Sequence, residues 1–263
     1  MVSRLRRKLT SIVNGAFPLG FIVLLLVTWE YWVRWKAVQE WILPGPALIA
    51  RTLADNLPLI LKHAQTTLME CLAGFALAII LSFVLAFAMD EVLLLRRALY
   101  PLLIASQTVP IISVAPLFII WFGYGVMPKI IVVILVCFFP IALSLLGGLA
   151  AVDREYLELF RSMKATRLDI FRMVKLPLAL PSFFSGLKIA ASYSVMGAVI
   201  GEWLGAKEGL GMYMTIAQRS FQVDRVFAAI LIVTALSAAL FALVALIERL
   251  VIPWNRLTEW RDL

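Results

Sequence analysis

The chain has 263 residues, of which 63% are hydrophobic and 15% are charged, and its mean hydropathy is +0.97. Soluble globular proteins are about half apolar and about a quarter charged, so this composition argues against a soluble enzyme and indicates a chain solvated by lipid. The formal net charge of +8 would indicate nucleic-acid binding in a soluble domain, but in a membrane protein the first question is which side of the bilayer carries the basic residues.

Six segments have the roughly 20 apolar residues that a helix needs to cross the hydrocarbon layer. They are residues 16–34, 66–89, 99–122, 127–150, 183–204 and 226–252. The first follows the basic start MVSRLRRK and has no small-residue cleavage site, so we expect a retained signal anchor. The predicted fold class is an all-α polytopic membrane protein with about six transmembrane helices, in a single domain that covers residues 1–263.

The distribution of basic residues predicts the orientation of these spans. With six spans and a cytoplasmic N-terminus, the C-terminus and residues 153–181 also face the cytoplasm. Most of the 24 lysine and arginine residues then lie on the cytoplasmic side, as the positive-inside rule requires. We therefore expect a multi-pass protein with both termini in the cytoplasm.

The charged segment 153–181 predicts a helix-turn-helix on the cytoplasmic face. Asp153 is a candidate N-cap for one short helix, and Thr166 with Asp169 resembles a capping box that opens a second. Pro177 and Pro181 are expected to end this second helix before the next span. A docking element for a cytoplasmic protein explains these features, whereas an interfacial loop that binds lipid head groups explains only the basic residues. Nucleic-acid binding is disfavoured because acidic and basic residues alternate.

The same segment, ELFRSMKATRLDIFRMVKLPLALP, resembles the EAA loop of the permease subunits of bacterial ABC importers. Glu158, Ala165 and the Leu-Pro pair that ends at Pro177 match its consensus, while a lysine, Lys164, replaces the usual glycine. Glycine accepts a left-handed backbone that costs a lysine roughly 1 kcal/mol, so the turn is expected to differ in detail. The residues that the resemblance and the capping pattern assign to ATPase coupling are Glu158, Phe160, Arg161, Lys164, Ala165, Thr166, Asp169 and Pro177.

The resemblance covers most of the chain. The stretches ILPGPALIARTL, SQTVPIISVAPLFIIWFGYG and GEWLGAKEGLGMYM are similar to the nitrate, sulfonate and taurine branch of these permeases. The resemblance implies a permease subunit in the bacterial inner membrane. This subunit would form a homodimer with a second copy and would bind cytoplasmic ATPase subunits. An extracytoplasmic binding protein would deliver the solute. The sequence has no G-x-x-x-x-G-K-[ST] loop, so ATP and Mg are expected in the partner ATPase.

Polar residues inside the spans are candidates for the translocation path, because burying them unpaired is expensive. They are Gln107, Thr108, Glu70 and Glu202. Gln107 is the strongest candidate. The nearby prolines leave backbone groups without helical hydrogen bonds, and such groups are tolerated inside a membrane only where they line a cavity or are buried in protein. Glu70 and Glu202 lie near span ends, where contact with interfacial water is the competing interpretation. Small residues spaced helically from Gly186 suit close packing, either at a dimer interface or within the subunit.

The two cysteines and the single histidine lack the spacing of a metal or catalytic site. We therefore predict no catalytic residue, cofactor or metal in this chain. The alternative classes are an intramembrane enzyme, which should show Asp, Ser-Lys or His-Glu constellations, and an exporter subunit. The sequence does not name the solute. The scarcity of basic residues in the middle of the spans favours a neutral or weakly charged heterocycle, such as a thiamine pyrimidine precursor, over nitrate, a sulfonate or taurine.

Overall fold

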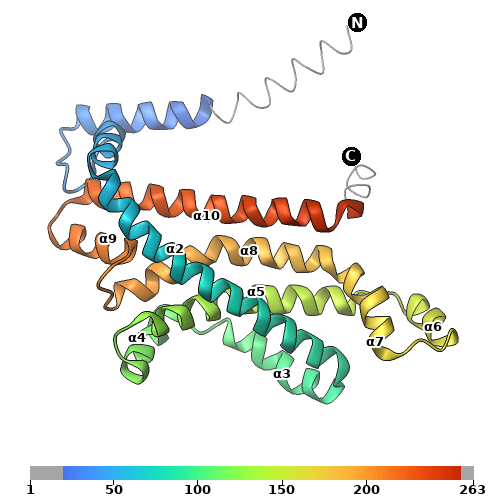
Figure 1. Cartoon of the computed structure of the whole chain (residues 1–263). Helices are drawn as coiled ribbons and strands as arrows, with labels where there is room; N and C mark the ends of the chain where they lie inside the picture. The colour runs from blue at the N-terminus through green and yellow to red at the C-terminus, as the bar shows by residue number, and fades with distance from the viewer. Residues whose placement is uncertain (1–19, 256–263) are drawn as a thin grey trace, which may run out of the picture. The chain divides into compact units, whose positions relative to one another are not determined.

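A computed structural model describes residues 20–255, and all the regular structure in these residues is helical (Figure 1). Residues 20–35 form the first helical stretch described, and a π-helical turn, Phe171–Lys175, precedes α8. The remaining helices are α2 (Pro46–Glu91), α3 (Leu93–Ser106), α4 (Ile111–Phe122), α5 (Val126–Ala150), α6 (Arg154–Ser162), α7 (Arg167–Ile170), α8 (Leu176–Trp203), α9 (Leu210–Arg219) and α10 (Val223–Val251). The predicted all-α class is confirmed.

Four helical stretches among the described residues are long and apolar enough to cross a membrane, and the bent pair α3 and α4 would make a fifth. The predicted spans at 66–89, 127–150, 183–204 and 226–252 correspond to α2, α5, α8 and α10. The predicted signal anchor begins at residue 16, outside the described residues, and its described part is helical from residue 20.

The predicted span 99–122 is not one continuous helix. Helices α3 and α4 meet at an angle of 104° across residues 107–110. Pro110 lacks the N–H that would continue the helical ladder, and its ring disfavours the α conformation for the residue before it. The chain therefore turns sharply beside Gln107 instead of crossing straight through.

The chain divides into two compact units. The first comprises the residues up to Ile60 together with Met214–Leu231. Within it, the Trp29 and Phe227 rings lie 5.7 Å apart, and the Thr52 hydroxyl donates a 2.7 Å hydrogen bond to Asp224. The second unit comprises Leu61–Tyr213 and the residues from Ile232 onwards, and it contains most of the candidate functional residues.

The core of the second unit is built around α5 and α8, which lie side by side (Figure 1). Glycines allow this approach: a Cβ on Gly186 would lie 2.6 Å from the carbonyl oxygen of Pro140 in α5. Ala190 and Ser194 on the same face of α8 are fully buried. The small-residue face therefore packs inside the subunit, which decides between the two interpretations of its sequence pattern.

Candidate functional site

The second helix of the charged segment begins with the capping box that the sequence predicts. The Thr166 hydroxyl accepts a 3.2 Å hydrogen bond from the Asp169 N–H, and the Asp169 carboxylate accepts a 3.0 Å bond from the Thr166 N–H. Asp153 occupies the N-cap position of α6, but its side chain makes no capping hydrogen bond. The local geometry of the turn is thus set mainly at Thr166.

The turn between α6 and α7 explains the usual glycine of the motif. Lys164 has a φ of +57°, in the left-handed region. The Lys164 N–H donates to the Arg161 carbonyl at 3.0 Å, and the Ala165 N–H donates to the Phe160 carbonyl at 3.1 Å. This pair of bonds is a Schellman motif, whose left-handed position favours glycine. Lys164 adopts this left-handed conformation at a cost of roughly 1 kcal/mol relative to glycine.

The prediction that Pro177 and Pro181 end the second helix is wrong. Helix α7 continues through the π-helical turn Phe171–Lys175 into α8, and Pro181 lies inside α8. Pro177 stands at the start of α8, directly after the wide turn, where a missing N–H interrupts the ladder least. The charged segment is thereby joined to a transmembrane helix without a loop.

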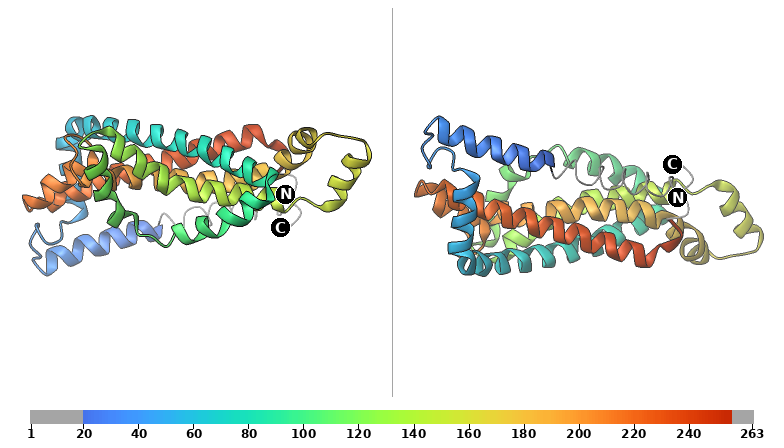
Figure 2. Two further views of the ribbon diagram at one scale, coloured as in Figure 1. Left: turned by 90° about the horizontal axis from the view of Figure 1, so that it is seen from below. Right: turned by 90° about the horizontal axis from the view of Figure 1, so that it is seen from above.

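Helix α6 projects beyond the ends of α5 and α8 (Figure 2). None of its residues, all of which the structure describes, is fully buried. Glu158, Arg161 and the apolar Leu159 are exposed, and Phe160 is partly buried. Of the other residues assigned to coupling, the exposed ones are Lys164, Thr166 and Asp169, and the partly buried ones are Ala165 and Pro177. The helix therefore presents polar and apolar side chains that the second unit leaves uncovered.

An ion pair ties the base of this segment to α2. The Lys175 ammonium lies 2.9 and 2.8 Å from the two carboxylate oxygens of Asp90, and both side chains are largely buried. They line a hollow of about 450 Å³ together with Arg161 and Arg167. The sequence offered no sign of this contact, because the partners are 85 residues apart.

Gln107 lines a different hollow, of about 500 Å³, at the break between α3 and α4. Phe139, Tyr193 and Met196 contribute to its wall, and none of the described residues that line it is charged. Gln107 and its neighbour Thr108 are both exposed, and the Thr108 hydroxyl donates a hydrogen bond back to the Ala105 carbonyl near the end of α3. The hollow can hold an apolar ring and offers one amide for hydrogen bonding.

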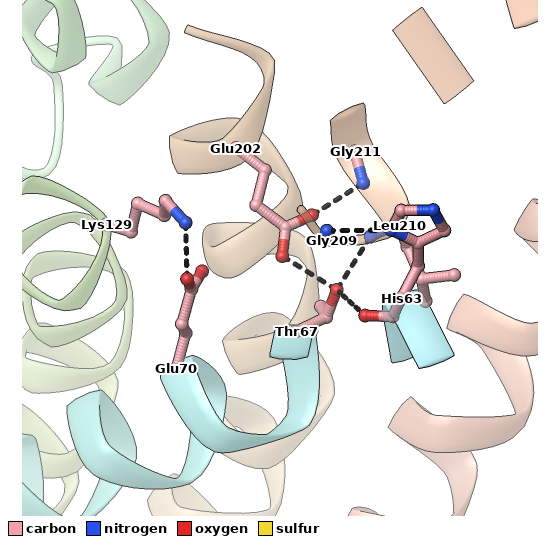
Figure 3. A network of polar contacts seen from close by, with 8 residues as sticks. All are labelled: His63, Thr67, Glu70, Lys129, Glu202, Gly209, Leu210 and Gly211. Atoms are coloured by element: carbon pink, nitrogen blue, oxygen red, sulfur yellow. Dashed lines mark hydrogen bonds and ion pairs between the residues drawn. The ribbon is translucent and has the colours of Figure 1, made fainter. Parts of the chain in front are cut away.

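Glu202 lies at the centre of a buried network, shown in Figure 3. Its carboxylate accepts hydrogen bonds from the Thr67 hydroxyl at 2.7 Å and from the Gly211 N–H at 2.6 Å. Only 1% of the residue is exposed, so the interpretation that Glu202 reaches interfacial water is wrong. Its own hydrogen-bond partners, supplied by α2 and α9, replace water around the carboxylate.

Glu70 belongs to the same network and is 2% exposed, so it does not reach interfacial water either. One of its carboxylate oxygens accepts from the Lys129 ammonium of α5, while the other oxygen has no hydrogen-bond partner among the described residues. Glu70 and Glu202 are neighbours in this network (Figure 3). The structure brings these two path candidates together and places Gln107 in a separate hollow.

Sequence reasoning missed Lys129, Thr67 and the glycines that surround Glu202. Lys129 stands near the start of α5, as it does in the predicted span 127–150, but its partner is 59 residues away. The one available signal was the spacing of glycines in GEWLGAKEGLG, where Gly209 and Gly211 follow Glu202. The described residues contain no group of three or more His, Cys, Asp or Glu placed to hold a metal.

The fold and the projecting charged segment define a class: a multi-span membrane protein with a helix-turn-helix that its other described helices leave uncovered. The chain belongs to the family described as "Binding-protein-dependent transport system inner membrane component", whose model matches residues 74–253. It is a permease subunit of an ABC importer, an inner-membrane transport component rather than an enzyme. The resemblance stated from the sequence is thereby confirmed, and the alternatives of an intramembrane enzyme or an exporter are set aside.

Two curated relatives are similar along most of their length. The formylaminopyrimidine transport permease protein ThiX of Halalkalibacterium halodurans is 40% identical over 240 residues, which are 91% of this chain and 96% of the relative. The riboflavin transport system permease protein RibX of Chloroflexus aurantiacus is 34% identical over 260 residues, 97% of each chain.

A solved structure titled "Crystal structure of an amino acid ABC transporter with histidines" has a similar fold, with a TM-score of 0.61 at 16% identity. The match covers 75% of this chain and 96% of that one. At this identity the likeness concerns the fold alone.

Proposed function

We propose that this permease carries a small, neutral or weakly charged heterocycle, of the formylaminopyrimidine type, that an extracytoplasmic binding protein delivers. The observation that carries the proposal is the 40% identity to a permease named for formylaminopyrimidine transport, over 91% of this chain. The similarity to a riboflavin permease supports the same chemical class, because both named solutes are nitrogen heterocycles.

The hollow beside Gln107 supports this solute on chemical grounds. Its wall is apolar and aromatic, with Phe139 and Tyr193 available to a flat ring and the Gln107 amide available to ring nitrogens or amino groups. Nitrate, sulfonates and taurine all carry an anionic group, which would favour lysine or arginine in the wall. None of the described residues that line this hollow is basic. Gln107 is thus the path candidate that lines this hollow, and Thr108 is exposed directly beside it.

The test is ligand screening followed by transport. Thermal shift of the partner binding protein against an aminopyrimidine, riboflavin, nitrate, an alkanesulfonate and taurine should single out the aminopyrimidine. Proteoliposomes that contain the complete importer should then take up that ligand only with ATP inside and binding protein outside. Stabilisation and uptake of taurine or an alkanesulfonate, without the aminopyrimidine, would replace the proposal with the anionic alternative.

The charged segment 153–181 docks on the partner ATPase, whose subunits bind ATP and Mg. Exposure of Leu159 and Glu158 on a projecting helix supports this role, because a docking helix concentrates binding energy in a few side chains. Glu158 is the polar anchor, Phe160 an apolar contact, and the Thr166–Asp169 capping box fixes the second helix. Exposed ion pairs add only about 0 to 1 kcal/mol each, so stability alone does not explain the charges.

Charge reversal tests the docking role. Glu158→Lys leaves the spans unaltered, so the variant should insert normally but lose the ATPase or its response to the loaded binding protein. Asp153→Lys is the matched control, since Asp153 is exposed on the same segment and its side chain makes no capping bond. Uptake and stimulated ATPase activity that remain near wild type in Glu158→Lys would remove Glu158 from the docking site.

The assembly is a homodimer of one-domain permeases, 1–263, with both termini and segment 153–181 in the cytoplasm. The ends of the chain lie outside the described residues, so the orientation rests on the distribution of basic residues. A cysteine placed at Arg161 in a variant without Cys71 and Cys137 should react with an impermeant maleimide in inside-out vesicles only. Labelling in intact spheroplasts would reverse the orientation.

A further inference from the structure

Side chains from two transmembrane helices hold the start of α9. Three successive backbone N–H groups donate hydrogen bonds: Gly209 to His63 Nδ1 at 3.1 Å, Leu210 to Thr67 Oγ1 at 2.9 Å, and Gly211 to Glu202 at 2.6 Å (Figure 3). The first N–H groups of a helix have no intrahelical partner, and here they find theirs on α2 and α8. A carboxylate at this end is also favoured by the helix dipole.

The backbone fits so closely around Glu202 that side chains are excluded. Gly209 has a φ of +120°, and a Cβ on it would lie 2.2 Å from the Glu202 carboxyl group. A Cβ on Gly211 would lie 2.6 Å from the Val199 carbonyl oxygen. Glycine at both positions is therefore what allows the chain to wrap around the buried carboxylate.

The network contains a hydroxyl with two acceptors. Thr67 Oγ1 lies 2.7 Å from a Glu202 oxygen and 3.2 Å from the carbonyl oxygen of His63. A hydroxyl has one hydrogen, so it bonds to only one of them at a time. When Glu202 moves away, the Thr67 hydroxyl can therefore donate its hydrogen bond to the His63 carbonyl instead, so the hydroxyl keeps an acceptor. Glu202 also neighbours the Glu70–Lys129 pair, so the network reaches α5 as well (Figure 3).

The network lies at the end of α8 opposite the charged segment. Helix α8 runs for 28 residues from Leu176, next to the π-helical turn, to Trp203, next to Glu202. At about 1.5 Å per residue the two ends are about 42 Å apart, enough to separate the two faces of a membrane. The α9 end is then the one that meets the binding protein, a placement that rests on the proposed orientation and delivery.

We propose that Glu202 is a positioning residue that latches the start of α9 onto α2 and α8, and that the loaded binding protein signals to the ATPase by releasing this latch. In secondary transporters access alternates when one helix bundle moves against another, and packed interfaces in general switch between discrete arrangements. A buried carboxylate with donors on two elements holds one such arrangement, because leaving these donors unpaired is unfavourable. Release frees the start of α9 and allows the end of α8 to shift relative to α2, and α8 leads back through the π-helical turn to the charged segment.

The test uses the complete importer in nanodiscs and measures two quantities. Amide hydrogen exchange of residues 209–211 reports the latch, and the ratio of stimulated to basal ATPase activity reports the signal. Glu202→Gln keeps the size of the side chain but removes the negative charge that strengthens the hydrogen bonds from Thr67 and Gly211 and that the dipole of α9 favours. We expect exchange to rise about tenfold. We also expect the stimulation ratio to approach one, because an α9 that is already free leaves the loaded binding protein nothing to release.

Glu208→Gln is the matched control, because Glu208 lies in the same turn, is exposed, and pairs only loosely with Lys62 at 3.5 Å. It should resemble wild type in both measurements. If Glu202→Gln does not assemble, Thr67→Val should reproduce its effects, and Thr67→Ser, which keeps the hydroxyl, should restore both values.

Three results would overturn the latch: exchange at 209–211 that stays at the wild-type rate, a stimulation ratio that stays at the wild-type value despite faster exchange, or Thr67→Ser that behaves like Thr67→Val. A wild-type complex that the loaded binding protein fails to stimulate would instead contradict the proposed delivery.

Discussion

Neutralising Asp90 is expected to destabilise the permease and to weaken the connection between the charged segment and α2. Its carboxylate holds the Lys175 ammonium through both oxygens, at 2.9 and 2.8 Å. Lys175 lies in the π-helical turn that joins α7 to α8, so the ion pair bridges the base of the segment to the end of α2. In Asp90→Asn the ammonium keeps its place but loses its counter-charge.

The size of the effect follows from the burial of the pair. The Asp90 side chain is 6% exposed and that of Lys175 is 21% exposed. Removing one partner of a fully buried pair costs about 3 to 5 kcal/mol, whereas a surface pair contributes about 0 to 1 kcal/mol. Since Lys175 retains some contact with water, we expect Asp90→Asn to cost about 2 to 3 kcal/mol. A loss of that size lowers the melting temperature by about 5 °C or more in a chain of this length.

The assay is a double-mutant cycle on the purified complex, read by thermal unfolding and by stimulated ATPase activity. The variants are Asp90→Asn, Lys175→Met, the double neutral variant, and the charge swap Asp90→Lys with Lys175→Asp. The coupling energy between the two positions should be about 1 to 3 kcal/mol, and the swap should recover part of both the stability and the activity. Glu91→Gln is the control, because it removes a neighbouring charge outside the ion pair.

Additive effects of the two single variants would refute this reasoning, since additivity means that the two side chains do not interact. The same conclusion follows if Asp90→Asn melts at the wild-type temperature. A swap that restores stability but leaves ATPase stimulation low would show that the ion pair stabilises the fold without contributing to ATPase stimulation.

Three further substitutions test the other sites. Lys164→Gly relieves the left-handed lysine and should raise the stability of the purified permease by up to about 1 kcal/mol in thermal unfolding; a lower melting temperature would contradict the Schellman turn. Gly186→Ala should cost about 1 to 3 kcal/mol because its Cβ meets the Pro140 carbonyl, whereas Gly147→Ala, with no atom within 4 Å, should be neutral or stabilising in the same assay. Gln107→Leu should leave assembly intact but weaken uptake of the heterocycle, and unchanged uptake kinetics would return Gln107 to a structural role.

Features that depend only on residues close together in the sequence were predictable from it. Apolar runs long enough to cross a bilayer identified α2, α5, α8 and α10, because hydropathy is a property of the segment itself. The Thr166–Asp169 capping box was readable for the same reason, since its partners are three residues apart. The conformational free energy that a lysine loses at position 164 was predictable as well, because it depends only on the backbone φ of that residue.

Contacts between distant residues were decided only by the tertiary structure. Thr67 and Glu202 are 135 residues apart, and no periodicity connects them. For both glutamates of the network the sequence leaves contact with interfacial water as an interpretation, because it shows their depth in a span but not the donors that other helices supply. For the same reason the sequence places Lys129 at the start of the span 127–150 but does not reveal its partner Glu70 on α2.

The prolines also show which features the sequence predicts and which ones the tertiary structure decides. A proline removes an N–H wherever it occurs, so the sequence predicts freed backbone groups near Gln107 within the span 99–122 and the end of a helix at Pro177. The chain turns by 104° before Pro110. It continues as a helix through Pro177, because the preceding π-helical turn accommodates the missing N–H, and Phe171 and Val174 in that turn are buried in the protein interior. Whether a missing hydrogen bond bends a helix or is accommodated depends on what packs against it, and that is a property of the folded chain.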